Sequence, residues 1–423
     1  MNLQKIKGTQ DFYGDRAVKM HYVENIMREL AINSGFSENR VPTFEATEVF
    51  VRSAGDESDI VSKEMYTFTD KGKRSITLRP EGTAGVARSF VENKMYANNL
   101  ALTKLFYIGP MFRYERPQAG RYREFNQFGV EVFGDGTSLL DADVIISAYN
   151  IFKKLGVNNL KLKINSIGDF ESRKAYAEVL KDYFKDNIDT MCEDCHRRLT
   201  TNPMRILDCK VDKDNPVLIN APKIKNNLNE HSLHYFQDVL NVLDKFNIPY
   251  EVDENLVRGL DYYADTVFEY IIESDDELNG LAICAGGKYA DLVKSFNGMD
   301  IPGIGYASGV ERIVSVMEKQ GLFDGLVQEI DVVVIAIDHD SKLLSLKIAN
   351  ELRLNDISCD LDYKNIGMKQ QFKFSDRVNA KYIIIIGENE RNNNIVQVKD
   401  VKNKDQIEVS INNLNKFLKG KLS

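Results

Sequence analysis

Residues 105–133 have the sequence LFYIGPMFRYERPQAGRYREFNQFGVEVF. Two runs of alternating side chains, 105–115 and 125–133, predict an antiparallel strand pair joined by a long polar loop. One face would carry arginine, glutamate and glutamine and the other would be apolar, a pattern that more often indicates a plain half-exposed sheet. The loop, however, contains Arg116, Arg121 and Arg123, whose planar guanidinium groups suit bidentate phosphate contacts. The strand pair is therefore a candidate floor for an anion-binding site.

Periodicity on both sides of this pair predicts the rest of the core. Residues 19–34 have the apolar spacing of a helix. Residues 169–247 are helical in pattern and charged, with no comparable strand. Strand-like runs follow at 266–272 and 281–285, and a helix at 308–319.

The C-terminal part has a different rhythm, in which strands and helices alternate. The strands are expected at 331–337, 358–363 and 382–386, and the helices at 341–354 and near 369–379. This alternation is typical of a small, mostly parallel α/β domain. The predicted class is α+β, with an antiparallel-sheet core over residues 1–325, a helical insertion at about 169–247, and a C-terminal α/β domain over 331–423.

The chain of 423 residues has a net charge of −8 and five cysteines. An odd number of cysteines in a long chain is typical of a reducing cytosol. The N-terminus has no apolar signal-peptide core, and no apolar run reaches the ~20 residues of a membrane helix, so we expect a cytoplasmic protein without a membrane partner. Residues 331–423 carry +2 and the rest −10. This asymmetry favours an anionic partner for the C-terminal domain only weakly, because a solvated charged surface is more common.

Three further segments place polar side chains at turns. Residues 77–83, TLRPEGT, put Glu81 and Thr83 at a strand-to-helix turn, where helix capping is an equally good explanation. Residues 256–263, LVRGLDYY, gather an arginine, an aspartate and two tyrosines around a glycine. Residues 303–312, GIGYASGVER, lead into a helix, but no βαβ unit with a distal acid surrounds their glycines. A dinucleotide-binding motif is therefore excluded, and a Walker phosphate loop is absent from the sequence.

Taken in order, these segments resemble the motifs of a known enzyme family. Residues 112–115, FRYE, with the arginine-rich loop resemble motif 2 of the class II aminoacyl-tRNA synthetases. Residues 309–312, GVER, resemble motif 3, and the helix leading to Pro42 resembles motif 1. LVRGLDYY and residues 285–289, AGGKY, are similar to the two histidine-specific motifs of histidyl-tRNA synthetases. The resemblance to that family covers nearly the whole chain.

The resemblance implies a reaction and its participants. The protein would be a histidine–tRNA ligase, which activates L-histidine with ATP and Mg²⁺ to histidyl-adenylate. It would then transfer histidine to the 3′ end of tRNA(His), releasing AMP and pyrophosphate. Neither a tightly bound cofactor nor a catalytic metal is implied. Motif 1 would form a homodimer interface, the C-terminal domain would bind the anticodon, and the insertion would clamp the acceptor stem.

The same resemblance implies roles for individual residues. Arg113 and Arg258 would be catalytic, holding the α-phosphate from two sides and contacting histidine. The other ATP-binding residues would be Glu115, Arg121, Phe125 and Arg312; the other histidine-binding residues Glu81, Thr83, Gln127, Glu131, Tyr262, Tyr263 and Tyr289; and the residues facing the tRNA acceptor end Gln118 and Arg123. An acid facing an imidazole N–H suits histidine, because isosteres without that donor leave the acid unpaired.

Lys288 and Ala290 depart from the family pattern. The second histidine motif usually runs GGRYD, so a guanidinium fork and a carboxylate are lost here. A synthetase-like regulatory subunit that binds histidine without charging tRNA is one rival, disfavoured because the ATP motifs and the C-terminal domain are present. A class II synthetase for another amino acid is disfavoured by LVRGLDYY and Glu131, and a class I enzyme by the absence of HIGH and KMSKS motifs.

Cysteines raise one further alternative. Cys192, Cys195 and Cys209, with the adjacent His196, could be a zinc site. A closed site needs four well-placed ligands, and His196 is too close to Cys195 in the chain to be a good fourth. Thiols without a metal are therefore the favoured interpretation of these residues.

Overall fold

The computed structural model describes residues 3–55, 58–97, 101–116, 121–209, 211–259, 262–364 and 366–422. The chain divides into two compact units, Met1–Asp324 and Gly325–Ser423. None of the described helices is long and apolar enough to cross a lipid bilayer.

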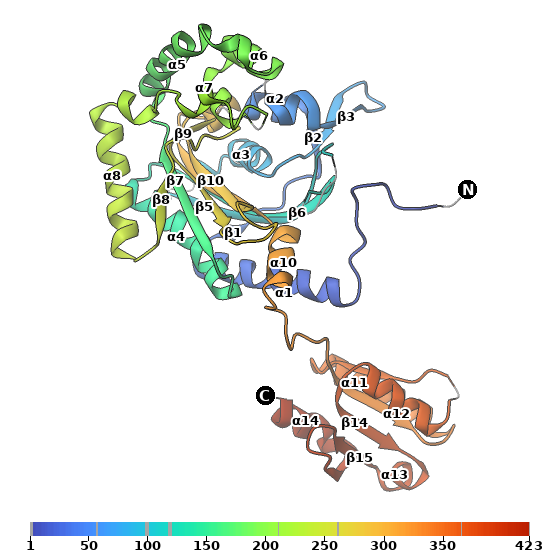
Figure 1. Cartoon of the computed structure of the whole chain (residues 1–423). Coiled ribbons are helices and arrows are strands. Elements are labelled where there is room, and N and C mark those ends of the chain that lie inside the picture. Colours follow the sequence, from blue (N-terminus) through green and yellow to red (C-terminus); the bar gives the residue numbers. More distant parts are fainter. Residues whose placement is uncertain are drawn as a thin grey trace. The chain divides into compact units, whose positions relative to one another are not determined.

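The larger unit is built on an eight-stranded sheet (Figure 1). Its strands lie in the order β1 (Ser37–Glu38), β5 (Thr103–Phe112), β6 (Glu124–Phe133), β11 (Gly303–Gly309), β10 (Ala282–Tyr289), β9 (Tyr263–Ile272), β7 (Leu160–Ser166) and β8 (Tyr250–Val252). The five inner pairings are antiparallel and the two edge pairings are parallel. The predicted antiparallel-sheet core is confirmed.

The strand pair that the sequence predicts at its centre is β5 and β6, in antiparallel register. β5 ends at Phe112, so Arg113 lies just beyond the sheet, at the start of the segment that leads into the loop. Both faces of β6 are buried from position 127 onward. Phe128 packs near Tyr306, and on the opposite face the side chain of Glu131 is only 1% exposed. The interpretation of this strand pair as a half-exposed sheet is therefore wrong.

Helices cover the sheet on both faces. On one face α1 (Asp15–Asn33) packs against α4 (Ser138–Leu155) and α10 (Val310–Lys319). α1 begins four residues before the expected helix, and the left-handed backbone of Gly35 (φ +79°) follows its end. On the other face α3 (Thr83–Glu92) packs against β6, and its first residue reaches Glu131.

A small three-stranded sheet precedes α3 in the chain. Its strands lie in the order β2 (Phe44–Ala46), β4 (Ser75–Leu78) and β3 (Tyr66–Thr69). The helix α2 (Thr47–Ala54) packs against β2 and β4. The π-helical turn η1 (Ile60–Glu64) contacts α2, and the 3-10 turn η2 (Met95–Ala97) contacts α3; a further short helix is α9 (Leu292–Ser295). α3 and α2 both contact α9.

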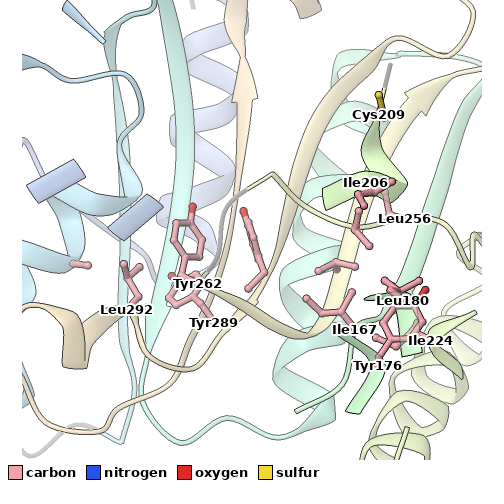
Figure 2. Close-up of a cluster of buried hydrophobic side chains, with 14 of the residues drawn as sticks. Ile167, Tyr176, Leu180, Ile206, Cys209, Ile224, Leu256, Tyr262, Tyr289 and Leu292 are labelled. Atoms are coloured by element: carbon pink, nitrogen blue, oxygen red, sulfur yellow. The ribbon is translucent and has the colours of Figure 1, made fainter. Parts of the chain in front are cut away.

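The insertion is helical, as predicted, and its described residues, 169–209 and 211–247, contain no strand. Its elements are α5 (Phe170–Lys185), η3 (Ile188–Thr190), α6 (Glu193–Thr201), η4 (Pro203–Asp208), α7 (Pro216–Ile219), η5 (Ile224–Asn227) and α8 (Glu230–Lys245). Figure 2 shows that its side chains Tyr176, Leu180 and Ile206 belong to one buried cluster with Tyr262 and Tyr289. The insertion therefore shares a hydrophobic core with the sheet.

The smaller unit contains a five-stranded sheet in the order β13 (Cys359–Leu361), β12 (Ile330–Ala336), β14 (Ala380–Ile386), β15 (Ile395–Asp400) and β16 (Gln406–Ser410). Its helical elements are α11 (Ser341–Leu354), α12 (Met368–Arg377), α13 (Glu388–Asn393), η6 (Ile411–Asn413) and α14 (Leu414–Leu422). The predicted α/β alternation is confirmed through β14. Two of the four pairings are antiparallel, however, so the sheet is mixed rather than mostly parallel.

Candidate active site

One cavity of about 590 Å³ opens between the large sheet and the segments around α3 and α10. Its walls include all thirteen described residues that the sequence assigns to ATP or histidine: Glu81, Thr83, Arg113, Glu115, Arg121, Phe125, Gln127, Glu131, Arg258, Tyr262, Tyr263, Tyr289 and Arg312. They come from segments more than 200 residues apart in the chain. Two groups of these residues differ in chemistry. We call the group of Glu81, Thr83, Gln127, Glu131 and Tyr289 the acid end, and the group of Arg113, Glu115, Arg121 and Arg312 the arginine end.

Glu131 lies at the centre of the acid end. Its Oε1 accepts a hydrogen bond from the Thr83 hydroxyl (2.6 Å), and its Oε2 accepts one from the Tyr289 hydroxyl (2.5 Å). Burial raises the pKa of Glu131 to about 8, although both hydroxyl groups oppose that shift. This carboxyl group is held in one orientation in a place that disfavours its own charge.

Glu81 joins the acid end from the turn before α3. Its carboxylate accepts hydrogen bonds from the backbone N–H groups of Thr83 (2.6 Å) and Ala84 (2.8 Å), the first two residues of the helix. The capping interpretation is therefore correct, because these N–H groups have no partner within the helix. The same side chain lines the cavity, and burial raises its pKa. Capping and cavity-lining are both properties of Glu81.

Gln127 is fixed by two donors to its side-chain oxygen. The Gly82 N–H (3.2 Å) and the Tyr107 hydroxyl (3.0 Å) both donate to Oε1. Tyr107 fits here only because its neighbours are glycines: an added Cβ would lie 2.2 Å from its ring at Gly82 and 2.4 Å from it at Gly129. Tyr107 is absent from the sequence-based site, and its only signal is an aromatic residue in an alternating strand.

Arg113, Arg121 and Arg312 form the arginine end, with Glu115 among them. Arg113 donates from Nε to the Pro80 carbonyl (2.8 Å), and Glu115 lies 3.8 Å from Arg113 and 3.3 Å from Arg121. Burial lowers the pKa of Arg312, and the nearby charges of Arg121 and Arg113 lower it further. A second acid, Glu64, lines the same cavity near Arg113 and Arg121, but burial raises its pKa. Three guanidinium groups against these two acids leave excess positive charge, which an anionic ligand would neutralise.

Arg258 lies beside the arginine end and forms an ion pair with Glu269. Burial by itself lowers the pKa of Arg258, but the Glu269 carboxylate together with Tyr263 and Tyr262 outweighs burial, so the pKa is raised. In the part of the chain that the structure describes, the buried Nε of Arg258 has no hydrogen-bond partner. A buried donor of this kind suits an incoming oxygen atom. Glu269 is a further site residue that the sequence analysis does not identify.

Glu311 is buried at the start of α10 and accepts hydrogen bonds from the backbone N–H (2.8 Å) and side-chain amide (3.0 Å) of Asn126. It therefore ties the helix carrying Arg312 to β6. Arg312 in turn donates to the Ala282 carbonyl (2.6 Å). The GVER segment contains Glu311, but nothing in the sequence shows that its carboxylate holds two elements together.

Of the two residues assigned to the tRNA acceptor end, Arg123 is not among the described lining residues of the cavity. The guanidinium of Arg123 lies over the ring of Tyr114 at 4.2 Å and donates from Nε to the Glu115 carbonyl (3.3 Å). Gln118 lies outside the described residues. Lys288, which stands where the family motif usually has arginine, is not among the described lining residues of the cavity. Its ammonium lies 3.4 Å from Asp265 and 4.0 Å from the ring centre of Tyr235.

Comparison with known proteins matches each of the two units to a family model. The family model described as histidyl-tRNA synthetase matches residues 8–313, and the model described as anticodon binding domain matches residues 331–421. The chain is 46% identical over 423 residues to the histidine–tRNA ligase of Geobacillus sp. (strain WCH70), with 100% of both chains covered. It is 47% identical over 411 residues to that of Anoxybacillus flavithermus, with 97% of both covered.

Solved structures agree. The structure of apo histidyl-tRNA synthetase from S. aureus is similar with a TM-score of 0.84 and 38% identity, over 99% of this chain and 100% of that one. A structure titled ATP phosphoribosyltransferase regulatory subunit/histidyl-tRNA synthetase, from Bacillus halodurans, shares the fold with a TM-score of 0.66 at 17% identity, over 92% of this chain and 99% of that one. The matched models and the full-length relatives show that this chain belongs to the histidyl-tRNA synthetase family.

Proposed function

We propose that this protein is a histidine–tRNA ligase whose cavity forms histidyl-adenylate and then passes histidine to the 3′ end of tRNA(His). The observation that carries the proposal is one cavity with a buried, doubly hydrogen-bonded Glu131 in one part and three arginines in another, with Arg258 beside them. The first part suits an imidazole N–H, and the second suits a nucleoside triphosphate. Membership of the family and the names of the full-length relatives support the same reaction.

Histidine would bind at the acid end. Glu131 would accept a hydrogen bond from an imidazole N–H, while Thr83 and Tyr289 keep the carboxylate in place. A side chain without an N–H at this point would cover the remaining acceptor position of a buried acid without filling it, at a cost of about 1–3 kcal/mol. Glu81 would receive the ammonium group, because each of its carboxylate oxygens accepts one hydrogen bond and can accept another. Gln127 Oε1 already accepts two hydrogen bonds, so the ammonium group would bind it by replacing one of those donors. Tyr262 and Tyr263 would close the pocket around the ring.

Adenylate formation would take place between the two ends. A carboxylate oxygen of histidine attacks the α-phosphorus of ATP, the bond from that phosphorus to the bridging oxygen breaks, and pyrophosphate leaves. Negative charge grows on the α-phosphate oxygens in this step. Arg113 and Arg258 would stabilise this charge from two sides, since cations that are already fixed in position act without reorganising. The unpartnered Nε of Arg258 supports this assignment.

The rest of ATP would occupy the arginine end. Phe125 and Arg312 would enclose the adenine ring, Glu115 would accept from its amino group, and Arg121 would contact the outer phosphates. The phosphate oxygens and water would hold the Mg²⁺ that accompanies ATP, because Glu115 and Glu269 already face arginines.

Transfer to tRNA completes the reaction. A hydroxyl of the terminal ribose attacks the carbonyl carbon of the adenylate, histidine becomes esterified to the tRNA, and AMP leaves. Arg123 and Gln118 would face the acceptor end, and the insertion would clamp the acceptor stem. The unit Gly325–Ser423 would bind the anticodon, which its match to an anticodon-binding model supports. A chain ending at Ile330 should then still make adenylate but charge tRNA poorly, and full charging by that fragment would overturn the anticodon assignment.

A homodimer would form through the motif 1 segment. Two apolar side chains near it are solvent-exposed in the single chain, Ile32 (55%) and Phe44 (57%). We expect sedimentation equilibrium to give twice the mass of the chain, and the double substitution Ile32→Glu with Phe44→Glu to shift it toward the monomer. A monomeric unmodified protein would contradict this assembly.

The experiment for the whole proposal is aminoacylation of unfractionated bacterial tRNA with each of the twenty labelled amino acids. We expect histidine alone to be incorporated, into a tRNA that reads histidine codons. Incorporation of another amino acid would refute the assignment of the acid end. Binding of histidine without any incorporation would favour a regulatory histidine-binding protein.

A further inference from the structure

Three cysteines and an aspartate converge in the insertion, outside the cavity described above. Cys192 precedes α6, Cys195 lies in its first turn, Cys209 follows η4, and Asp212 comes three residues later. Their side-chain ligand atoms all lie within 4.8 Å of one another. The other two cysteines of the chain, Cys284 and Cys359, do not belong to this group.

The distances within the group match the edges of a tetrahedron around a metal ion. With Zn–S bonds of about 2.3 Å, two sulfur ligands are separated by about 3.8 Å, and a sulfur and an oxygen ligand by about 3.5 Å. Here Cys192 Sγ lies 3.6 Å from the sulfur atoms of both Cys195 and Cys209. Asp212 Oδ2 lies 3.2 Å from Cys195 Sγ and 3.4 Å from Cys209 Sγ. These four edges agree with the expected spacing to within a few tenths of an ångström.

The geometry points to a structural Zn²⁺ site formed by Cys192, Cys195, Cys209 and Asp212. The ligand set is closed, because three thiolates and one carboxylate oxygen supply four ligands and leave no open position. Three Zn–S bonds and one Zn–O bond form, and the three thiol protons pass to solvent. Cys195 and Cys209 are 0% and 4% exposed, so the site is shielded on the side of the insertion core.

Asp212 resolves the objection that the sequence raises against zinc. His196 is exposed in the helix and is not one of the converging groups. The fourth ligand is instead the carboxylate of Asp212, three residues after Cys209. The usual zinc-site patterns of cysteine and histidine do not contain an aspartate. The backbone N–H of Cys192 also donates to Asp212 Oδ2 (3.0 Å), which orients the carboxylate toward the sulfur atoms.

The site joins parts of the insertion that contact the walls of the active cavity. From α6, Arg198 contacts Asp59 (3.3 Å), the residue before the turn η1, and Asp194 contacts Lys63 (3.1 Å) within that turn. From η4, Arg205 donates to the carbonyl of Gly259 (2.8 Å), next to Arg258. Figure 2 shows Ile206 and Cys209 at one end of the buried cluster that also contains Tyr262. We therefore infer that the zinc ion positions η1 and the Arg258 segment through α6 and η4.

The test is the metal content of the full-length protein, prepared with excess thiol reductant, loaded with ZnSO4 and passed through a desalting column. We expect one zinc per chain by mass spectrometry in the unmodified protein and in the matched control Cys359→Ser, which removes a buried cysteine of the other unit. Cys209→Ser should retain little zinc. Asp212→Asn, which keeps the size of the side chain, should lose zinc to a chelator concentration that leaves the unmodified protein loaded.

Cobalt supplies a readout that does not depend on catalysis. Co²⁺ in place of zinc should give thiolate-to-cobalt charge-transfer absorption and the d–d bands of a tetrahedral ion, both absent in Cys209→Ser. An unmodified protein that retains neither metal would overturn the proposal, as would a disulfide between two of these cysteines in the reduced preparation. Because these readouts need no substrate, their failure is distinguishable from failure of the proposed ligase activity.

Discussion

The acid end and the arginine end of the cavity are built in opposite ways. At the acid end the polar groups bond to one another: Thr83 and Tyr289 both donate to Glu131, and Tyr107 donates to Gln127. At the arginine end the guanidinium groups are anchored by backbone carbonyls, Arg113 by Pro80 and Arg312 by Ala282, and like charges lie close together. A preassembled hydrogen-bond network favours a ligand whose shape and hydrogen-bond donors match it. An excess of positive charge favours a polyanion instead.

This contrast predicts that the two ends control different kinetic constants. Substitutions at the arginine end should lower the rate of adenylate formation, because its charges meet those that develop in the transition state. Substitutions at the acid end should raise the KM for histidine, because its contacts are made equally in the ground state.

The largest effect is expected for Arg113→Ala. Without this guanidinium, the negative charge that develops on the α-phosphate loses one stabilising cation. We expect kcat for pyrophosphate exchange to fall by about 10²–10³-fold, equivalent to about 3–4 kcal/mol. The matched control is Arg74→Ala, which removes an arginine that pairs with Asp70 on the surface. A change confined to the KM for ATP, with kcat intact, would contradict the separation of the two ends.

Glu131→Gln should have the next largest effect. The amide keeps the shape but removes the charge that the imidazole N–H meets, so we expect the KM for histidine to rise about 10–100-fold, from loss of about 1.5–3 kcal/mol. The value of kcat should change by only a few fold. Glu92→Gln, on the exposed end of α3, is the control. A large fall in kcat with an unchanged KM would mean that Glu131 acts in the chemical step.

The pKa of Glu131 predicts a pH dependence. Because burial raises this pKa to about 8, the carboxyl group of the free enzyme is protonated below that pH and becomes an acceptor for an N–H only when it loses the proton. The KM for histidine should therefore fall as pH rises from about 6.5 to 8.5, by at most about tenfold per unit. The profile should flatten in Glu131→Gln, which also corrects for titration of histidine itself. An identical slope in the two proteins would assign the titration elsewhere.

Tyr107→Phe should have the smallest effect of the series. It removes one hydrogen bond to Gln127 between neutral groups and leaves the ring between Gly82 and Gly129. We expect a loss of about 1 kcal/mol, seen as a roughly fivefold higher KM for histidine with kcat unchanged. Tyr13→Phe, at an exposed tyrosine, should change neither constant. A loss in Tyr107→Phe as large as that in Glu131→Gln would show that Tyr107 holds the whole network.

Much of the fold follows from local patterns in the sequence. The alternation around Arg113 and the helical spacing of α1, α10 and α11 predict those elements to within a few residues, because periodicity is a property of each segment alone. The mixed sheet of the smaller unit was not predictable in this way. β15 and β16 are short and follow the asparagine-rich helix α13, and only their pairing beside β14 makes them strands.

The candidate site divides along the same line. The motif resemblance identified the thirteen lining residues, because each motif is a contiguous stretch of sequence. Tyr107, Glu269, Glu311 and Asp212 were missed, because each depends on a partner distant in sequence or on a ligand type outside the usual pattern. Glu269 becomes a candidate only once β9 places it beside Arg258, and Asp212 only once three sulfur atoms surround it.

The measurement that tests the account most directly is pyrophosphate exchange into ATP without tRNA, run with each of the twenty amino acids on the unmodified protein and on Glu131→Gln. We predict exchange with histidine alone, and in Glu131→Gln the same maximal rate reached only at much higher histidine concentration. Exchange driven by another amino acid, or a Glu131→Gln protein with an unchanged KM for histidine, would contradict the assignment of the acid end as the histidine site.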